Sequence, residues 1–144
     1  SYTVPRGATE NLDTNHPKFK NTYPFSERLP LAYSTRPSVA LCNQNSYSNA
    51  EIFSHAYKAL ELGKLVGQPT FGAVISTGSY SLVDGSYVRR PFRGWFVKES
   101  EMGMEHNPAV PDILDENPPA YKARNVDPQL KRAVEELISQ IDRV

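Results

Sequence analysis

One stretch of the sequence, SVALCNQNSYSNAEIFSHAYKALELGKLV, most restricts the folds open to this chain. Residues 38–41 are apolar on both faces, which is typical of a buried strand in a parallel sheet. A helical pattern follows over about 49–62, and residues 64–66 predict a second short strand. A strand, a helix and a strand in this order favour a right-handed crossover between parallel strands. The sequence therefore predicts an α/β fold built on a βαβ unit.

The helical part of this unit predicts one buried stripe and a defined end. Apolar residues recur at helical spacing, and Gly63 suits the C-terminal stop of the helix. The residues of this expected stripe are Phe53, Ala56, Tyr57 and Leu60.

The rest of the chain predicts a β-hairpin, a loop region and a last helix. Asp84-Gly85 between SYSLV and SYVRR is a strong hairpin signal. Residues 101–119 contain HNPAVPD and ENPP and are expected to be loops. A C-terminal helix should open at Asp127, with Pro128 at its first position. Its expected apolar stripe consists of Leu130, Val134, Leu137 and Ile141, with Ala133 and Ile138 beside it.

Residues 1–37 show no steady hydrophobic period and are rich in Pro, Asn, Thr and Tyr. They predict an irregular arm or loop, with a helical turn near residues 25–29. Residues 38–144 are expected to form the remaining part of one domain. Because the sequence begins with Ser and carries no signal segment, we expect it to be a piece of a longer protein whose upstream part is missing.

Composition excludes several classes of function. Hydrophobic residues make up 39% of the 144 residues and charged residues 22%, which is typical of one globular domain. Lys plus Arg and Asp plus Glu both number 16, without a basic block, which argues against a nucleic-acid or anionic-membrane partner. No apolar run is long enough to span a bilayer. Cys42 is the single cysteine, so an internal disulfide and a cysteine-based zinc site are excluded, and no metal-ligand spacing occurs.

Small polar residues fill the junction between the first strand and the helix, and Ser48 is central to it. A helix start leaves backbone N–H groups unpaired, so it can stabilise an anion. Two interpretations of Ser48 stay open. Ser48-x-x-Glu51 fits a capping box worth about 1 kcal/mol, which composition alone favours. Ser48 is also placed to act as a nucleophile, with the next N–H as an oxyanion donor.

The run NSYSNAEIFSHAYKALELGKLVGQPTFG resembles the core of the tail-specific (carboxyl-terminal-processing) serine peptidases and of tricorn protease. In those proteins a helix and a GxPTxG segment follow the nucleophilic serine. SLVDGSYVRRPFRGWFV and MEHNPAVPD are more similar to the tricorn branch. The resemblance covers about residues 38–141. It implies a crotonase/ClpP-like α/β fold and peptide-bond hydrolysis through an acyl-enzyme, without a cofactor.

Carried over by position, the resemblance implies roles for three residues. Ser48 is the nucleophile, the backbone N–H of Asn49 is one oxyanion donor, and Glu105 matches the downstream carboxylate of tricorn. Glu105 would support a Ser-His pair lying before residue 1. The family's second oxyanion donor comes from a glycine-rich stretch, and residues 1–47 contain none. Ala73 stands where the tail-specific enzymes have their catalytic lysine, which excludes a Ser/Lys dyad on this motif.

The histidines of this chain are weak candidates for the general base. His55 follows Ser48 by seven residues, about 10 Å along a helix, which is too far for proton transfer. We expect His55 on the helix surface. His106, next to Glu105, and His16, in the arm, stay open as alternatives. Cys42 is expected to be a small buried apolar residue.

The resemblance also implies partners: an extended peptide or unfolded-protein substrate, the upstream part of the same protein and, as an open option, further copies in a homo-oligomer. The alternative is a peptide-binding or scaffolding module that has the peptidase fold and does no chemistry. Ala73 in the lysine position and the lack of a glycine cluster and of a well-placed histidine support this alternative.

Overall fold

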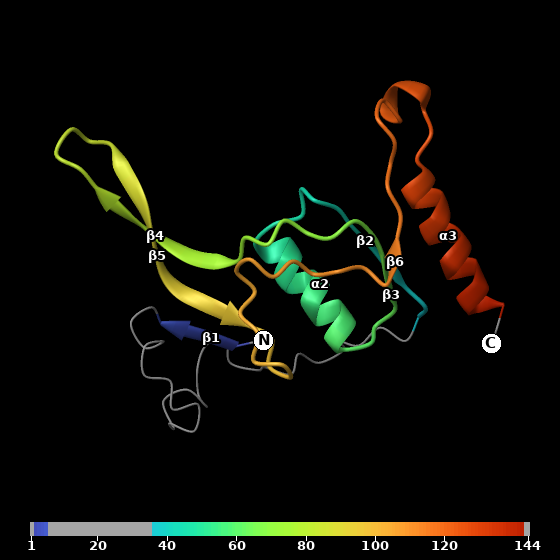
Figure 1. Cartoon of the computed structure of the whole chain (residues 1–144), viewed down its shortest axis with the longest axis horizontal. Helices are drawn as coiled ribbons and strands as arrows, with labels where there is room; N and C mark the ends of the chain where they lie inside the picture. Colours follow the sequence, from blue (N-terminus) through green and yellow to red (C-terminus); the bar gives the residue numbers. More distant parts are fainter. Residues whose placement is uncertain (1, 6–35, 143–144) are drawn as a thin grey trace.

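The computed structural model describes residues 2–5 and 36–142 of the chain (Figure 1). In chain order the elements are β1 (Tyr2–Pro5), β2 (Val39–Cys42), α2 (Asn49–Ala59), β3 (Lys64–Gly67), β4 (Ile75–Ser81), β5 (Tyr87–Phe96), β6 (Ile113–Leu114), the 3-10 helix η2 (Lys122–Arg124) and α3 (Pro128–Ile141). The strands form two sheets, ordered β1–β5–β4 and β2–β3–β6. The predicted α/β class is confirmed.

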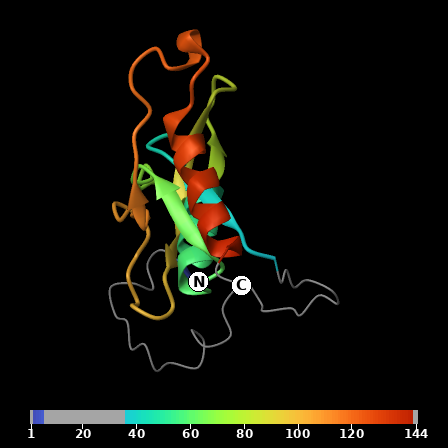
Figure 2. The same ribbon diagram turned by 90° about the vertical axis from the view of Figure 1, so that its right-hand side faces the viewer.

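The predicted βαβ unit forms the centre of the structure. β2 pairs with β3 in parallel, with Val39 opposite Lys64 and Cys42 opposite Gly67. The short strand β6 adds to β3, also in parallel, within the region expected to be loops. A strand of two residues is too short to show an alternating hydrophobic pattern, so the sequence could not predict it. The β2–β3–β6 sheet lies between α2 and α3 (Figures 1 and 2).

The core is small and centres on β2 and β3. Leu65 and Val66 are fully buried, and Leu65 clusters with Tyr57 of α2; Ala40, Cys42 and Ala109 complete this cluster. The apolar composition of β2 predicted burial on both faces. Within the described residues this prediction is wrong for one face, because Leu41 is 45% exposed.

The buried face of α2 differs from the predicted apolar stripe. Phe53 and Leu60 are 56% and 67% exposed, whereas Tyr57 is buried. The residues that the helix buries are Glu51, Ser54 and Tyr57. Two of these are polar and are buried through hydrogen bonds, which a hydrophobic pattern cannot reveal. The helix also ends earlier than predicted, because Glu61, rather than Gly63, takes the left-handed conformation after it, with φ 51°.

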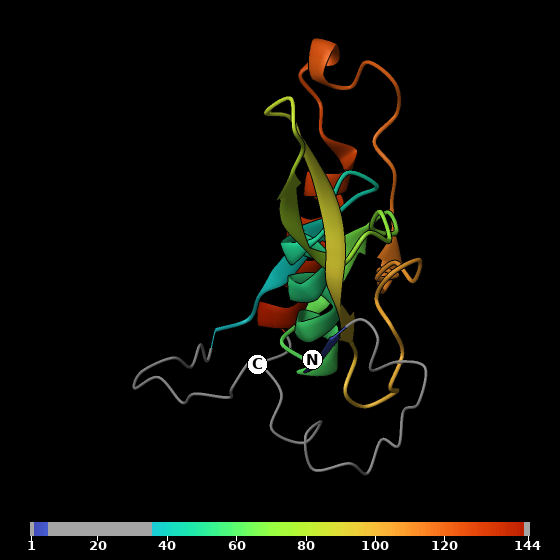
Figure 3. The same ribbon diagram turned by 90° about the vertical axis from the view of Figure 1, so that its left-hand side faces the viewer.

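The predicted hairpin is confirmed and forms the long arm of the structure. β4 and β5 pair antiparallel, with Tyr80 opposite Val88. In the turn, the Asp84 carboxylate accepts hydrogen bonds from the N–H and hydroxyl of Ser86 at 2.9 and 2.6 Å, and Gly85 has φ 84°. Figure 1 shows this turn extending away from α2, and Figure 3 shows the two strands running side by side.

The first residues of the chain form strand β1, although the sequence predicted an irregular arm for residues 1–37. β1 pairs antiparallel with β5, with Tyr2 opposite Phe96. This pairing joins residues about ninety positions apart, so local sequence carries no signal for it. The predicted helical turn near residues 25–29 lies outside the described residues.

Helix α3 begins as predicted. The Asp127 side chain caps it by accepting the Leu130 N–H at 3.0 Å, and Pro128 follows at the first turn. α3 contacts β2 and β3, as Figure 2 shows, and buries Gln129 and Ala133. Most of the predicted stripe is about half-exposed within the described part of the chain: Leu130, Val134, Ile138 and Ile141. Among the described residues, no helix is long and apolar enough to cross a membrane.

Candidate functional site

Ser48 occupies an unusual backbone conformation at the start of α2. It is the N-cap residue of the helix, with φ 57° and ψ −118°. Positive φ is uncommon for a residue with a side chain and persists only where the surrounding structure enforces it. Such strain collects at functional sites, and a strained strand-to-helix turn is one known way to present a serine. The Ser48 N–H donates to the Ala73 carbonyl at 3.0 Å.

The capping interpretation of Ser48 holds for its backbone more than for its hydroxyl. Ser48 and Glu51 face each other in the arrangement of a capping box. The Glu51 carboxylate accepts from the Ser48 N–H at 3.3 Å. The Ser48 side chain, however, forms no capping hydrogen bond of regular geometry. Its side chain nevertheless faces the Glu51 N–H within the capping box, so the capping role and the proposed nucleophilic role are compatible at Ser48.

The N–H of Asn49 is open among the described residues. The next N–H groups of the helix start are used: Ala50 donates to Tyr47 at 3.2 Å and Glu51 donates to Ser48 at 3.0 Å. Asn49 has no such backbone hydrogen bond in the described part of the chain, and the residue is exposed. An open N–H at a helix N-terminus, where the helix dipole is positive, favours a negative charge beside it.

Glu51 is the best-anchored residue of the site, and the sequence predicted only a capping role for it. Its side chain is 0% exposed. Oε1 accepts from the Thr70 hydroxyl and the Gly72 N–H, both at 2.6 Å. Oε2 accepts from the Ala73 N–H at 2.7 Å. The Ser-x-x-Glu spacing marked Glu51, but local sequence could not show that residues 70–73 fold back onto it.

Glu105 binds the same short segment as Ser48. Its Oε2 accepts from the Val74 N–H at 2.7 Å, and the side chain is half-buried. Since Ser48 binds the carbonyl of Ala73, successive residues of one segment hold both predicted site residues. The backbone next to Glu105 is tied down as well, because the His106 N–H donates to Gly72 at 2.8 Å.

The histidines do not supply a base to Ser48 within the described residues. His106 is exposed, and His16 lies outside the described residues. His55 is half-buried on the side of α2 that faces residue 107, and its Nε2 donates to the Asn107 carbonyl at 3.2 Å. Burial lowers the pKa of His55 below its usual value, with the Asn107 hydrogen bond and the Glu51 charge acting in the opposite direction.

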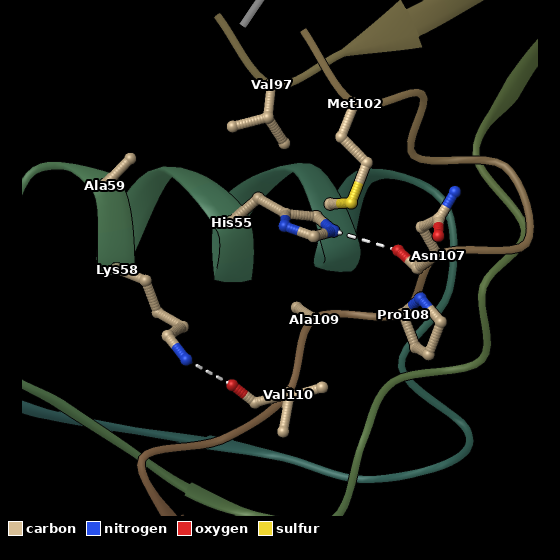
Figure 4. Close-up of a pocket in the computed structure, with 9 residues that line it drawn as sticks. All are labelled: His55, Lys58, Ala59, Val97, Met102, Asn107, Pro108, Ala109 and Val110. Carbon is tan, nitrogen blue, oxygen red and sulfur yellow. Dashed lines mark hydrogen bonds between the residues drawn. The ribbon is translucent and has the colours of Figure 1, made fainter. Parts of the chain in front are cut away.

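A pocket of about 580 Å³ lies beside the C-terminal half of α2 (Figure 4). The His55 ring and the Lys58 side chain project from the helix toward residues of the 97–110 segment. Lys58 pairs with Asp112 at 3.3 Å and donates to the Val110 carbonyl, so its charge is already engaged. The remaining lining is mainly apolar: Ala59, Val97, Met102, Pro108, Ala109 and Val110.

Cys42 is a buried apolar residue, as predicted, and is poorly suited to act as a nucleophile. It is 3% exposed, and its Sγ donates to the Gln68 carbonyl at 3.1 Å. Burial raises the pKa of the thiol to about 11. Since the thiolate is the reactive form, Cys42 should be inert in the folded protein.

Comparison with known proteins shows what this chain is similar to. The family model described as Peptidase family S41 matches residues 4–114. Tricorn protease of Thermoplasma volcanium is 34% identical over 118 residues, 81% of this chain and 12% of that protein. Tricorn protease homolog 1 of Streptomyces coelicolor is 36% identical over 99 residues, 68% of this chain and 9% of that protein.

The fold agrees with these sequence matches. The crystal structure of the tricorn protease superposes with a TM-score of 0.67 and 30% identity, over 72% of this chain and 10% of that one. This chain thus spans only 9–12% of the length of the relatives described here.

Proposed function

Because this chain belongs to peptidase family S41, we propose that it is the nucleophile-bearing portion of a tricorn-like serine peptidase, with Ser48 as the nucleophile. The observation that carries the proposal is the strained turn at Ser48, with φ 57°, beside the open N–H of Asn49. Acyl transfer needs a nucleophile and an oxyanion donor that reach the same carbonyl group. Here both come from consecutive residues at a helix start.

In the proposed reaction, Ser48 Oγ attacks the carbonyl carbon of the scissile peptide bond while a base removes the hydroxyl proton. The carbonyl oxygen becomes an oxyanion, which the Asn49 N–H stabilises. The tetrahedral intermediate collapses, the amine leaves with a proton, and an ester remains on Ser48. Water then hydrolyses this ester and restores the hydroxyl.

The general base in this proposal is a histidine supplied from outside the described residues, with Glu105 supporting it. Ala73 argues against a lysine base on the PTFG motif, because its methyl side chain carries no amine. The backbone of Ala73 is instead engaged in holding the site. Its N–H donates to Glu51 at 2.7 Å and its carbonyl accepts from Ser48 at 3.0 Å. The Glu105 carboxylate is held through Oε2 by the N–H of Val74, the residue after Ala73. Its Oε1 has no hydrogen bond in the described part of the chain.

The proposed substrates are extended peptides or unfolded segments, by analogy with the peptidase family. The rest of the proposed site, namely the base and a second oxyanion donor, comes from a further part of the same protein. The proposal therefore applies to the protein in its active form, whichever segments that form contains.

The test is turnover of a quenched fluorescent peptide together with labelling by a fluorophosphonate, which reacts with activated serines. Ser48→Ala should abolish both readouts and leave the melting temperature nearly unchanged. Ser46→Ala is the matched control, since Ser46 lies in the same turn and its hydroxyl accepts from the Asn43 N–H at 3.1 Å. Turnover that survives Ser48→Ala would rule out the proposed nucleophile.

A second candidate function is a peptide-binding module without catalysis. The observation that favours it is that no described histidine or lysine hydrogen-bonds to Ser48. This candidate predicts that the complete protein binds peptides without cleaving them and that Ser48→Ala leaves the affinity unchanged. Isothermal titration with an uncleaved peptide distinguishes the two functions.

A further inference from the structure

We infer that Glu51 is a positioning residue, whose buried carboxylate holds the Ser48 turn in its reactive conformation by tying the start of α2 to residues 70–73. The inference rests on the proposed function, because it explains how Ser48 is kept ready. Glu51 is fully buried in the third position of the helix. A buried carboxylate is destabilising unless it is paired or fully hydrogen-bonded. Among the described residues no cation forms an ion pair with Glu51.

Four donors take the place of a cation. Oε1 receives the Thr70 hydroxyl and the Gly72 N–H, both at 2.6 Å. Oε2 receives the Ala73 N–H at 2.7 Å and the Ser48 N–H at 3.3 Å. Three of the four donors lie outside the helix, about twenty residues further along the chain. An ordinary capping glutamate has only the single reciprocal bond to the N-cap N–H, so Glu51 does more than cap α2.

The Ser48 amide is held from two directions by this arrangement. Its N–H donates to the Ala73 carbonyl at 3.0 Å and, more weakly, to Glu51 at 3.3 Å. Glu51 in turn fixes Ala73 through the Ala73 N–H. The positive φ of Ser48 needs such over-determination, since a free serine would return to an ordinary conformation and turn its hydroxyl away. The hydrogen bonds of Glu51 therefore maintain the backbone conformation of the nucleophile.

The same carboxylate also sets the position of Ser48 relative to Glu105. The Thr70 hydroxyl that donates to Glu51 accepts the Ala109 N–H at 2.8 Å. Glu105 accepts the N–H of Val74, one residue beyond Ala73. Both ends of the 105–109 loop are thus bound to the segment that Glu51 organises.

The main experiment is the isosteric change Glu51→Gln in the active protein. An amide NH₂ then faces N–H groups that now meet a carboxylate oxygen, so the turn should loosen without a change in side-chain volume. We expect kcat and the fluorophosphonate labelling rate to fall by roughly 10–100-fold, because small displacements of a nucleophile carry costs of this size. KM should stay within about twofold, since Glu51 is buried and does not touch substrate.

Asp127→Asn is the matched control. It also converts a carboxylate that accepts from a helix-start N–H and a side-chain amide into an amide, but at α3. It should lower the melting temperature and leave kcat unchanged. Should Glu51→Gln fail to fold, Thr70→Val removes one donor to the same carboxylate and should lower kcat in the same direction. A folded Glu51→Gln protein with wild-type kcat would overturn the inference, as would unchanged kcat in Thr70→Val.

Amide hydrogen exchange gives a readout that does not depend on activity. In Glu51→Gln, peptides covering residues 46–49 and 70–74 should exchange about tenfold faster, while β2 and β3 stay protected. Unchanged exchange in both segments would refute the positioning role of Glu51 even if the protein has no turnover. Activity that survives Ser48→Ala would instead defeat the proposed function, and the exchange comparison would still test Glu51.

Discussion

An ester in place of the peptide bond between Ser48 and Asn49 removes one N–H group and leaves every side chain unchanged. This N–H is the proposed oxyanion donor, and it has no backbone hydrogen bond in the described part of the chain. Its removal therefore breaks no hydrogen bond of the folded state that the structure describes. Introduced by semisynthesis, the ester separates the role of this donor in the transition state from its role in folding.

The expected magnitude follows from what each state loses. The transition state loses one oxyanion donor, which lowers kcat by about 10²–10³-fold, or about 2.7–4 kcal/mol. The folded state is affected only because an ester carbonyl is a weaker acceptor. The Ser48 carbonyl accepts the N–H groups of Glu51 and Ile52 at 3.0 and 3.1 Å. Weakening these two bonds should cost about 1 kcal/mol of unfolding free energy.

The assay compares kcat for a peptide substrate and the free energy of unfolding in urea with those of a matched ester at Ala50. The Ala50 ester removes an N–H that donates to Tyr47 at 3.2 Å, so it should destabilise the helix start at least as much. It should nevertheless retain most of the activity. If the two esters lower kcat equally, or if the Asn49 ester changes kcat by less than about threefold, the Asn49 N–H is not an oxyanion donor.

Three further predictions concern Glu105, Cys42 and His55. Glu105→Gln should lower kcat/KM by about tenfold or more without unfolding the protein, because it removes a charge while the Val74 N–H keeps an acceptor; kinetics and thermal melting together check this. Cys42, with its pKa raised to about 11 by burial, should resist iodoacetamide in the native protein and react only on unfolding, as mass spectrometry of the alkylated protein would show. His55 has a pKa lowered by burial, so the unfolded chain takes up a proton first as the pH falls. Stability from neutral His55 is complete above about pH 6.5 and is lost below it, and melting temperatures between pH 8 and 5 should decline more steeply for wild type than for His55→Asn.

The parts of the fold that the sequence predicted are those with local signals. Asp84-Gly85 adopts a turn closed by Asp84 itself, and Asp127-Pro128 starts α3 with a side-chain cap. The βαβ unit follows from the order of its elements, which restricts the topology. β1 and β6 were not predicted, because each forms only by pairing with a strand that is distant in the sequence. Tyr2 lies opposite Phe96, and Ile113 lies opposite Val66.

The candidate site shows the same division between local and distant causes. Ser48 and Glu105 could be selected because each lies in a motif whose order along the chain resembles a known family. The strain at Ser48 could not be predicted, because it arises from the carbonyl of Ala73, twenty-five residues away. A positive φ is uncommon for serine, so the sequence at this position favours an ordinary cap.

Hydrophobic periodicity predicts the buried face of α2 only in part: Tyr57 is buried as expected, but Phe53 is not, for a physical reason that bears on the site. The pattern assumes that burial follows apolarity, and it therefore selects Phe53, whereas the helix buries Glu51 and Ser54. Ser54 is accommodated by donating to the Ala50 carbonyl at 2.8 Å, and Glu51 by four donors. Burying polar groups in this way adds little net stability compared with an apolar side chain of the same size, but it fixes directions, because hydrogen bonds are geometrically specific. A helix that only had to pack would bury Phe53; a helix that has to hold a strained serine at its first turn gains from a carboxylate there.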